Sequence, residues 1–169
     1  MRPSFGTLDS EDTPVWEPLV IAIDPGVSTG FAVWSPTSKF INTGQDRHDR
    51  VIDDLASLFG RMTTDTKSRT RVIIENFIIP ARPVGGQAEA SRTIRTIGGV
   101  ETVCRQAGVT QVKERLPGER NMVTVTMLRR WGWVRDGDNT GRDSNSAMQH
   151  LGAVLLESGV VPDRRDVVR

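Results

Sequence analysis

The sequence has few of the features that mark a secreted or membrane-bound protein. Its 169 residues include a single cysteine, Cys104, so an intrachain disulfide cannot form and a cysteine-rich zinc site is excluded. No apolar run approaches the ~20 residues that a transmembrane helix requires. The net charge is only +1, which by itself says little about partners. We therefore expect a cytoplasmic protein.

The composition that is present fits one globular domain with a hydrophobic core. Hydrophobic residues make up 37% of the chain and charged residues 25%. We expect a flexible acidic N-terminal tail (1–18), a folded domain (19–157) and a polar C-terminal tail (158–169). Two basic clusters suit either a phosphate backbone or a solvated surface. They are Arg61, Lys67, Arg69 and Arg71, and Arg129, Arg130, Arg135 and Arg142.

The first feature of chemical interest is an apolar run, 20–23, that ends in Asp24. Four consecutive apolar residues predict a strand covered on both faces. The Pro-Gly and Thr-Gly residues that follow predict a turn into an antiparallel strand over 30–35. Asp24 then lies at the carboxyl end of a buried strand, where an unpaired carboxylate is costly. A metal ion, a basic side chain or backbone N–H groups could be its partner.

A second apolar run, 72–74, also ends in a carboxylate, Glu75. We expect a third strand over 39–44 and an amphipathic helix over 49–62 before it. A strand that follows a helix is most simply parallel to the first strand, through a right-handed crossover. Adjacent parallel strands would bring Asp24 and Glu75 together at the sheet end where open α/β sheets bind ligands.

The last helix carries the third candidate acid. The rest of the chain predicts a loop over 63–70, a helix over 86–107, a strand over 109–116, and helices over 123–131 and 143–157. Asp143, Ser146 and His150 fall on one stripe beside the apolar face of the last helix. An acid in a first turn also suits the helix dipole, so Asp143 has a structural explanation as well.

Three acids therefore stand out by position: Asp24, Glu75 and Asp143. Converging carboxylates repel, and their pKa values rise unless a cation lies between them. Mg²⁺ or Mn²⁺ is the natural hard cation for oxygen ligands, and two such ions would activate water and stabilise the leaving oxygen in phosphodiester cleavage. Alternatively, arginine side chains or the backbone N–H groups of turns, rather than metal ions, could be the partners of these carboxylates.

Three motifs around these acids carry a family resemblance. Ile23-Asp24-Pro25-Gly26 with Thr29-Gly30-Phe31-Ala32-Val33 resembles the first motif of the RuvC family of Holliday-junction resolvases, in the ribonuclease H-like superfamily. Val72-Ile73-Ile74-Glu75 resembles the second motif, and Arg142-Asp143 with Ser146-Ala147 resembles the third. The resemblance covers about residues 19–157 and extends to actinobacterial-phage proteins of similar size, so a phage origin and the host cytoplasm are expected. It implies an α/β ribonuclease H-like fold: a five-stranded mixed sheet, three antiparallel strands then parallel strands, flanked by helices.

The resemblance also implies a function. The chain would be a divalent-metal-dependent endonuclease that cleaves branched DNA, a Holliday-junction resolvase acting as a homodimer. Asp24, Glu75 and Asp143 would be catalytic residues that hold Mg²⁺ or Mn²⁺, with two ions expected.

One departure from the family pattern concerns the fourth ligand. The family typically has a second acid three residues beyond its helix acid, where this chain has Ser146. His150, one turn further along, could serve as a ligand or proton carrier, and a surface or core-edge histidine is the alternative. Asp136 or Asp138 could also enter from the preceding loop.

Residues beyond the acids bear on substrate and on competing functions. Arg82, Arg92 and Arg95 follow Glu75 and are expected to contact DNA at the rim of the site. A catalytically weak or idle module that binds structured nucleic acid and a ribonuclease H-like nuclease of RNA–DNA hybrids stay open. Asp-x-Gly-x-x-Thr-Gly also resembles the phosphate loop of actin-like and sugar-kinase ATPases, but those need two such domains and 169 residues supply one.

Overall fold

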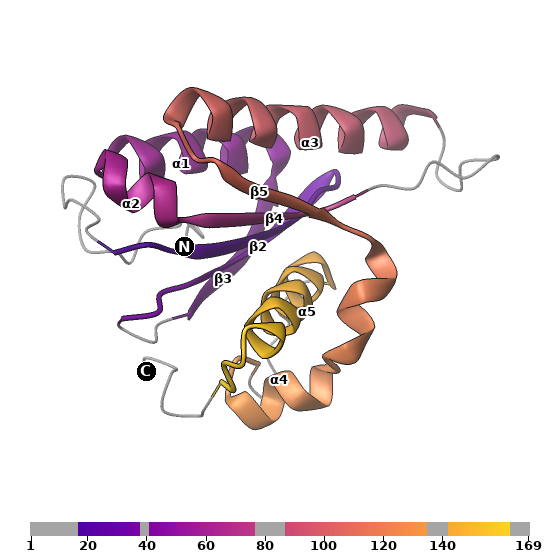
Figure 1. Cartoon of the computed structure of the whole chain (residues 1–169). Helices are drawn as coiled ribbons and strands as arrows, with labels where there is room; N and C mark the ends of the chain where they lie inside the picture. Colours follow the sequence, from indigo (N-terminus) through magenta and orange to yellow (C-terminus); the bar gives the residue numbers. More distant parts are fainter. Residues whose placement is uncertain (1–16, 38–40, 77–86, 135–141, 163–169) are drawn as a thin grey trace.

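A computed structural model of the chain describes residues 17–37, 41–76, 87–134 and 142–162. Figure 1 shows the arrangement of its elements. The elements in chain order are β1 (Val20–Asp24), β2 (Ser28–Trp34), β3 (Ile41–Arg47), α1 (His48–Gly60), α2 (Thr64–Arg69), β4 (Arg71–Glu75), α3 (Gln87–Ala107), β5 (Gln111–Arg115), the 3-10 helix η1 (Pro117–Met122), α4 (Val125–Trp131) and α5 (Arg142–Glu157).

The five strands form one mixed sheet in the order β3-β2-β1-β4-β5. The first three strands pair antiparallel, and β4 lies parallel to both β1 and β5. This confirms the α/β fold with three antiparallel strands followed by parallel ones. Ile23 pairs with Ile74, so the acids that follow them, Asp24 and Glu75, leave the sheet at the same end.

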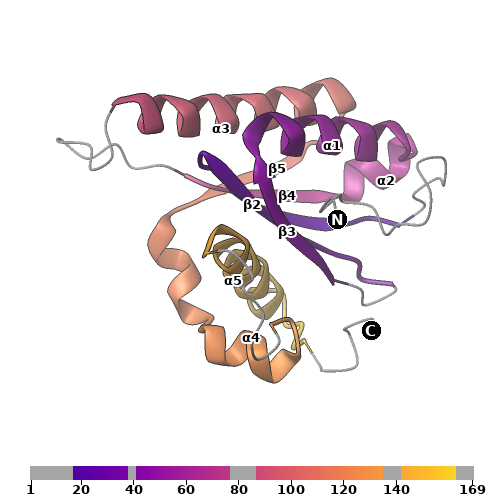
Figure 2. The same ribbon diagram turned by 180° about the vertical axis from the view of Figure 1, so that it is seen from behind.

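Helices cover both faces of the sheet. In Figures 1 and 2, α1, α2 and α3 lie on one side and α4 and α5 on the other. Ile21 and Ile23 pack in the core with α1 and α3, whereas Val20 and Ala22 pack in the core with α5. Both sides of β1 are thus buried, which explains why its sequence is a continuous apolar run without alternation.

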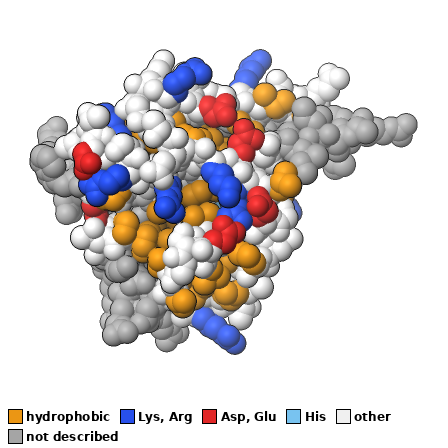
Figure 3. Space-filling view, in the orientation of Figure 1, with side chains coloured by type: hydrophobic (Ala, Val, Ile, Leu, Met, Phe, Trp, Pro, Cys, Tyr) orange, Lys and Arg blue, Asp and Glu red, His pale blue; other side chains and the backbone are white. Residues whose placement is uncertain are grey.

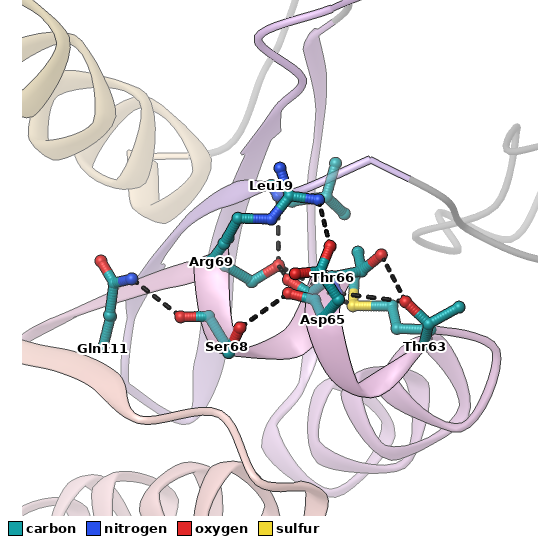
Figure 4. Close-up of polar contacts among 9 residues, drawn as sticks. Leu19, Thr63, Asp65, Thr66, Ser68, Arg69 and Gln111 are labelled. Carbon is teal, nitrogen blue, oxygen red and sulfur yellow. Dashed lines mark hydrogen bonds and ion pairs between the residues drawn. The ribbon is translucent and has the colours of Figure 1, made fainter.

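The predicted loop over 63–70 is wrong, because residues 64–69 within it form the short helix α2. The Thr63 Oγ1 accepts a hydrogen bond from the Thr66 N–H at 3.1 Å and caps the helix. Its residues carry no apolar stripe, so hydrophobic periodicity could not reveal it. Figure 4 shows the polar contacts that hold it, including that from the Gln111 side chain to the Ser68 carbonyl at 2.8 Å.

Other differences concern element boundaries and the tails. The third strand is Ile41–Arg47 where 39–44 was predicted, and residues 38–40 lie outside the described residues. The 3-10 helix η1 was not predicted, and α4 begins only after its Thr124 cap. Residues 1–16 and 163–169 also lie outside the described part, so the two predicted tails stay predictions. No helix in the described ranges is both long and apolar enough to span a bilayer.

Candidate functional site

Three acids from three different elements line one pocket. Asp24 ends β1, Glu75 ends β4 and Asp143 lies in the first turn of α5. The pocket has a volume of about 740 Å³, and Arg120 from η1 and Ser146 from α5 also line it. We refer to the space bounded by Asp24, Glu75, Arg120, Asp143 and Ser146 as the carboxylate pocket.

A glycine allows α5 to bring its first turn to this pocket. Gly30 pairs with Asp24 across β1 and β2. A Cβ atom at Gly30 would lie 2.1 Å from the Asp143 carbonyl oxygen and 2.7 Å from the Ser144 nitrogen. The start of α5 therefore rests directly on the backbone of β2. Gly30, which lies within β2, thus sets how closely Asp143 can approach the sheet.

Glu75 is the most heavily engaged of the three acids. Its Oε2 atom contacts the Arg120 guanidinium, the His150 Nε2 atom at 2.7 Å and the Ser146 Oγ atom at 3.4 Å. Burial by itself would raise the pKa of Glu75, but the hydrogen bond from His150 and the charge of Arg120 outweigh it and lower that pKa. Glu75 is therefore held as a carboxylate.

Asp24 is in the opposite electrostatic situation. Burial raises its pKa to about 7, and the negative charges of Glu75 and Asp143 act in the same direction. A hydrogen bond with Ser146 and the charge of Arg120 oppose this rise without cancelling it. A cation in the pocket would favour the ionised form of Asp24.

His150 lies beneath the pocket rather than on its wall. Its side chain is fully buried, and its Nε2 atom donates to Glu75, because a carboxylate can only accept. Within the described ranges its Nδ1 atom has no hydrogen-bond partner. The structure thus brings His150 to Glu75 as a hydrogen-bond donor from the same helix stripe that carries Ser146. Asp136 and Asp138, the other candidates for a fourth group, lie outside the described residues.

The oxygen atoms of the pocket's carboxylates are chemically suited to bind a hard divalent cation. Carboxylate oxygens are the ligands that Mg²⁺ and Mn²⁺ prefer, and three carboxylates line this pocket. Among the described residues, however, no group of three His, Cys, Asp or Glu side chains is arranged to hold a metal ion. The Arg120 guanidinium provides the positive charge at Glu75 instead.

Arg120 is the residue that the sequence did not reveal. It lies in the stretch Pro117–Met122, where the Pro-Gly pair predicted only the end of a strand. Its role depends on η1 lying against α5, a contact between segments about 25 residues apart that no local pattern encodes.

Two of the three arginines predicted to contact DNA, Arg92 and Arg95, lie on α3 outside the pocket lining. Arg92 and Arg95 are exposed on α3 and do not line the carboxylate pocket, although Glu89, Ala90 and Thr93 of the same helix do. Arg82 lies outside the described residues. On the face seen in Figure 3, Lys and Arg side chains are interspersed with acidic and hydrophobic ones rather than gathered in one patch.

Comparison with known proteins gives a likeness of fold. No protein-family model matches the chain, and no curated protein matches it. RuvC of Thermus thermophilus, in a structure with a Holliday junction substrate, is 16% identical with a TM-score of 0.54 over 86% of this chain and 99% of that one. A second RuvC structure from Thermus thermophilus is 13% identical with a TM-score of 0.49 over 84% and 97% of the two chains. The first of these structures supports a RuvC-like, ribonuclease H-like fold.

Proposed function

We propose that the protein is a divalent-metal-dependent endonuclease that hydrolyses phosphodiester bonds in branched DNA, with the Holliday junction as its substrate. The observation that carries this proposal is the convergence of Asp24, Glu75 and Asp143 on one pocket at the carboxyl end of β1 and β4. The RuvC-like fold adds support, because the similar Thermus thermophilus protein was solved with a junction. The phage origin inferred from the motifs stays a prediction.

In this proposal each residue has a distinct task. Asp24, Glu75 and Asp143 would hold Mg²⁺ or Mn²⁺, which when bound lowers the pKa of a water molecule and stabilises charge on the phosphate oxygens. His150 orients the Glu75 carboxylate from below through its 2.7 Å hydrogen bond. Arg92 and Arg95 would bind the DNA backbone from α3, outside the pocket.

A homodimer is part of the same proposal. A junction is resolved by cutting two strands symmetrically, and two copies of one site related by a two-fold axis meet that need. The expected partners are therefore a second copy of this chain and a four-way junction.

An idle module that binds structured nucleic acid is the second candidate. It is favoured by Ser146, which stands where the family has an acid, and by the Arg120 guanidinium at Glu75. In this case the fold would recognise branched DNA while the pocket lacks the charge to hold its cations firmly.

The test is cleavage of a labelled four-way DNA junction with Mg²⁺ or Mn²⁺, beside linear duplex and RNA–DNA hybrid. We expect paired, symmetric nicks in the junction, reduced by about a hundredfold or more in Asp24→Asn. Asp65→Asn is the matched control, because Asp65 is an exposed acid paired with Arg69 in α2. Cleavage of hybrid alone would favour a ribonuclease H-like nuclease.

A Ser146→Asp variant separates the enzyme from the idle module. If the native protein binds the junction tightly without cutting it, and Ser146→Asp cuts it, the missing carboxylate is the cause. If neither protein cuts while both bind, the second candidate replaces the first.

A further inference from the structure

Arg120 places a positive charge inside the carboxylate pocket. Its Nη1 atom contacts both the Glu75 Oε2 atom and the Ser146 Oγ atom. The Arg120 side chain is 28% exposed and the Glu75 side chain 12%, so the pair is only partly shielded from solvent. Its charge also lowers the pKa of Asp24, against the effects of burial and the neighbouring acids. Arg120 thus partly neutralises two of the three acids.

The contact between Arg120 and Glu75 leaves little room for a metal cation at the same carboxylate. Contacts with Arg120, His150 and Ser146 converge on the same oxygen, Oε2. A carboxylate oxygen has about two lone-pair positions, so the N–H donors of Arg120 and His150 are enough to occupy it. A divalent ion at that oxygen would also lie beside the guanidinium and be repelled by it. Binding of a metal ion to Glu75 Oε2 therefore requires one of the donors to leave.

Arg120 is the donor best placed to leave. The side chain of His150 is fully buried, and Ser146 lies on the long helix α5. Arg120 instead belongs to the 3-10 helix η1, none of whose residues is buried, and its neighbour Met122 is 52% exposed. Its guanidinium can turn towards solvent and the open pocket without disturbing the core.

We propose that Arg120 is a resident counter-ion of the carboxylate pocket, and that a divalent cation takes its place at Glu75. The inference rests on the proposed metal-dependent function and deepens it, because the guanidinium marks where a cation would bind. Once released, Arg120 remains on the pocket wall with no carboxylate partner at Glu75. It is then free to pair with a phosphate of the nucleic acid, so that cation binding and phosphate binding favour each other.

The test measures Mn²⁺ affinity directly, by the electron paramagnetic resonance signal of free Mn²⁺ titrated with metal-free protein. Arg120→Gln keeps a hydrogen-bond donor but removes the charge, and we expect it to bind Mn²⁺ about tenfold more tightly than the native protein. Arg120→Lys keeps the charge and should bind Mn²⁺ as the native protein does. Arg69→Gln is the matched control, because it removes an arginine paired with a carboxylate on the exposed surface of α2.

A second measurement covers the folding of the variants. Without metal, Arg120→Gln should melt at a lower temperature than the native protein, and Mn²⁺ should raise its melting temperature more than that of the native protein. Equal or weaker Mn²⁺ affinity in a folded Arg120→Gln, or no Mn²⁺ binding by either protein, overturns the inference. Because no DNA is present, these outcomes are independent of the cleavage assay: a native protein that cuts no junction contradicts the proposed function and leaves the Mn²⁺ comparison to stand.

Discussion

Arg115 and Arg120 lie five residues apart in the chain, and each forms an ion pair with a glutamate. The two ion pairs differ in geometry and in exposure. Arg115, the last residue of β5, donates from both terminal nitrogens to Glu157 at the end of α5, at 2.9 and 2.6 Å. Its side chain is 2% exposed. Arg120 contacts Glu75 through one nitrogen and is 28% exposed. The first pair is bidentate and joins a buried arginine to a glutamate that is 42% exposed, whereas the second is made through one nitrogen between two partly buried side chains.

These differences in geometry and exposure distinguish an ion pair with a structural role from an ion pair in the carboxylate pocket. Arg115 joins the edge strand β5 to the C-terminal end of α5 and lines no part of the carboxylate pocket. Arg120 lines that pocket and shares Glu75 with His150. The Arg115–Glu157 pair therefore holds the C-terminal end of α5 against β5, and the Arg120–Glu75 pair balances charge near the other end of α5. Burial and geometry, rather than residue type, assign the role.

The largest effect of a substitution is expected from breaking the bidentate pair. Arg115→Gln removes two charge-assisted hydrogen bonds to the half-exposed Glu157 carboxylate and should lower the free energy of unfolding by about 2–3 kcal/mol. Arg120→Gln in the metal-free protein should cost about 1 kcal/mol or less, because solvent screens that pair. Urea unfolding of both variants, followed by circular dichroism, measures the difference. Equal losses would show that the two pairs are equivalent and would remove the contrast.

A somewhat smaller effect is expected at the other end of α5. Gly30→Ala forces a Cβ atom against the Asp143 carbonyl and should cost about 2 kcal/mol through overpacking. It should also weaken Mn²⁺ binding, because the first turn of α5 must move away from β2. Gly98→Ala is the control: nothing lies within 4 Å of its Cβ position, in the middle of α3, so that change should stabilise the protein by up to about 1 kcal/mol. A tolerated Gly30→Ala would mean that α5 does not need this close approach.

Beyond the substitutions, the pH dependence of stability sharpens the comparison. The folded protein keeps a proton on Asp24 up to a pKa of about 7, whereas the unfolded chain releases it near 3.8. The stability of the metal-free protein should therefore fall as pH rises from about 4 to 7. The pKa of Glu157 is lowered by its hydrogen bonds with Arg115, so that pair loses stability in the opposite direction, as pH falls below the usual range of glutamate.

Thermal unfolding across this pH range tests the assignment. In Asp24→Asn, stability should no longer fall between pH 4 and 7. The loss of stability at lower pH, which comes from the Arg115–Glu157 pair, should remain. A native protein whose stability is flat from pH 4 to 7 would contradict the raised pKa of Asp24.

Much of the fold followed from local patterns. The apolar runs that end in Asp24 and Glu75 predicted two buried parallel neighbours, and the pairing of Ile23 with Ile74 confirms it. The amphipathic stripes of α1 and α5 were also recognised, because periodicity reports directly which face is buried. The helix α2 was missed for the same reason: it is polar throughout and is stabilised by the Thr63 cap.

The candidate site also contains residues that local patterns revealed and residues that they did not. The sequence singled out Asp24, Glu75, Asp143 and His150, because acids that end apolar runs and residues seven apart on one helix stripe are visible in the order of residues. Their assignment as catalytic or metal-binding residues stays a prediction. That His150 lies fully buried beneath Glu75 and Arg120 lies against its Oε2 atom could not be predicted, because both depend on packing between distant segments.

The sequence by itself determined where most strands and helices form and at which ends the acids stand, since these depend on short-range periodicity, turn residues and chain direction. Only the tertiary structure decided which charges meet. The position of η1 against α5 sets Arg120 at Glu75, the closeness of α5 to Gly30 sets Asp143 at the pocket, and burial raises the pKa of Asp24. Electrostatic partners are fixed by distances of a few ångströms between segments far apart in the chain, and no local pattern carries that information.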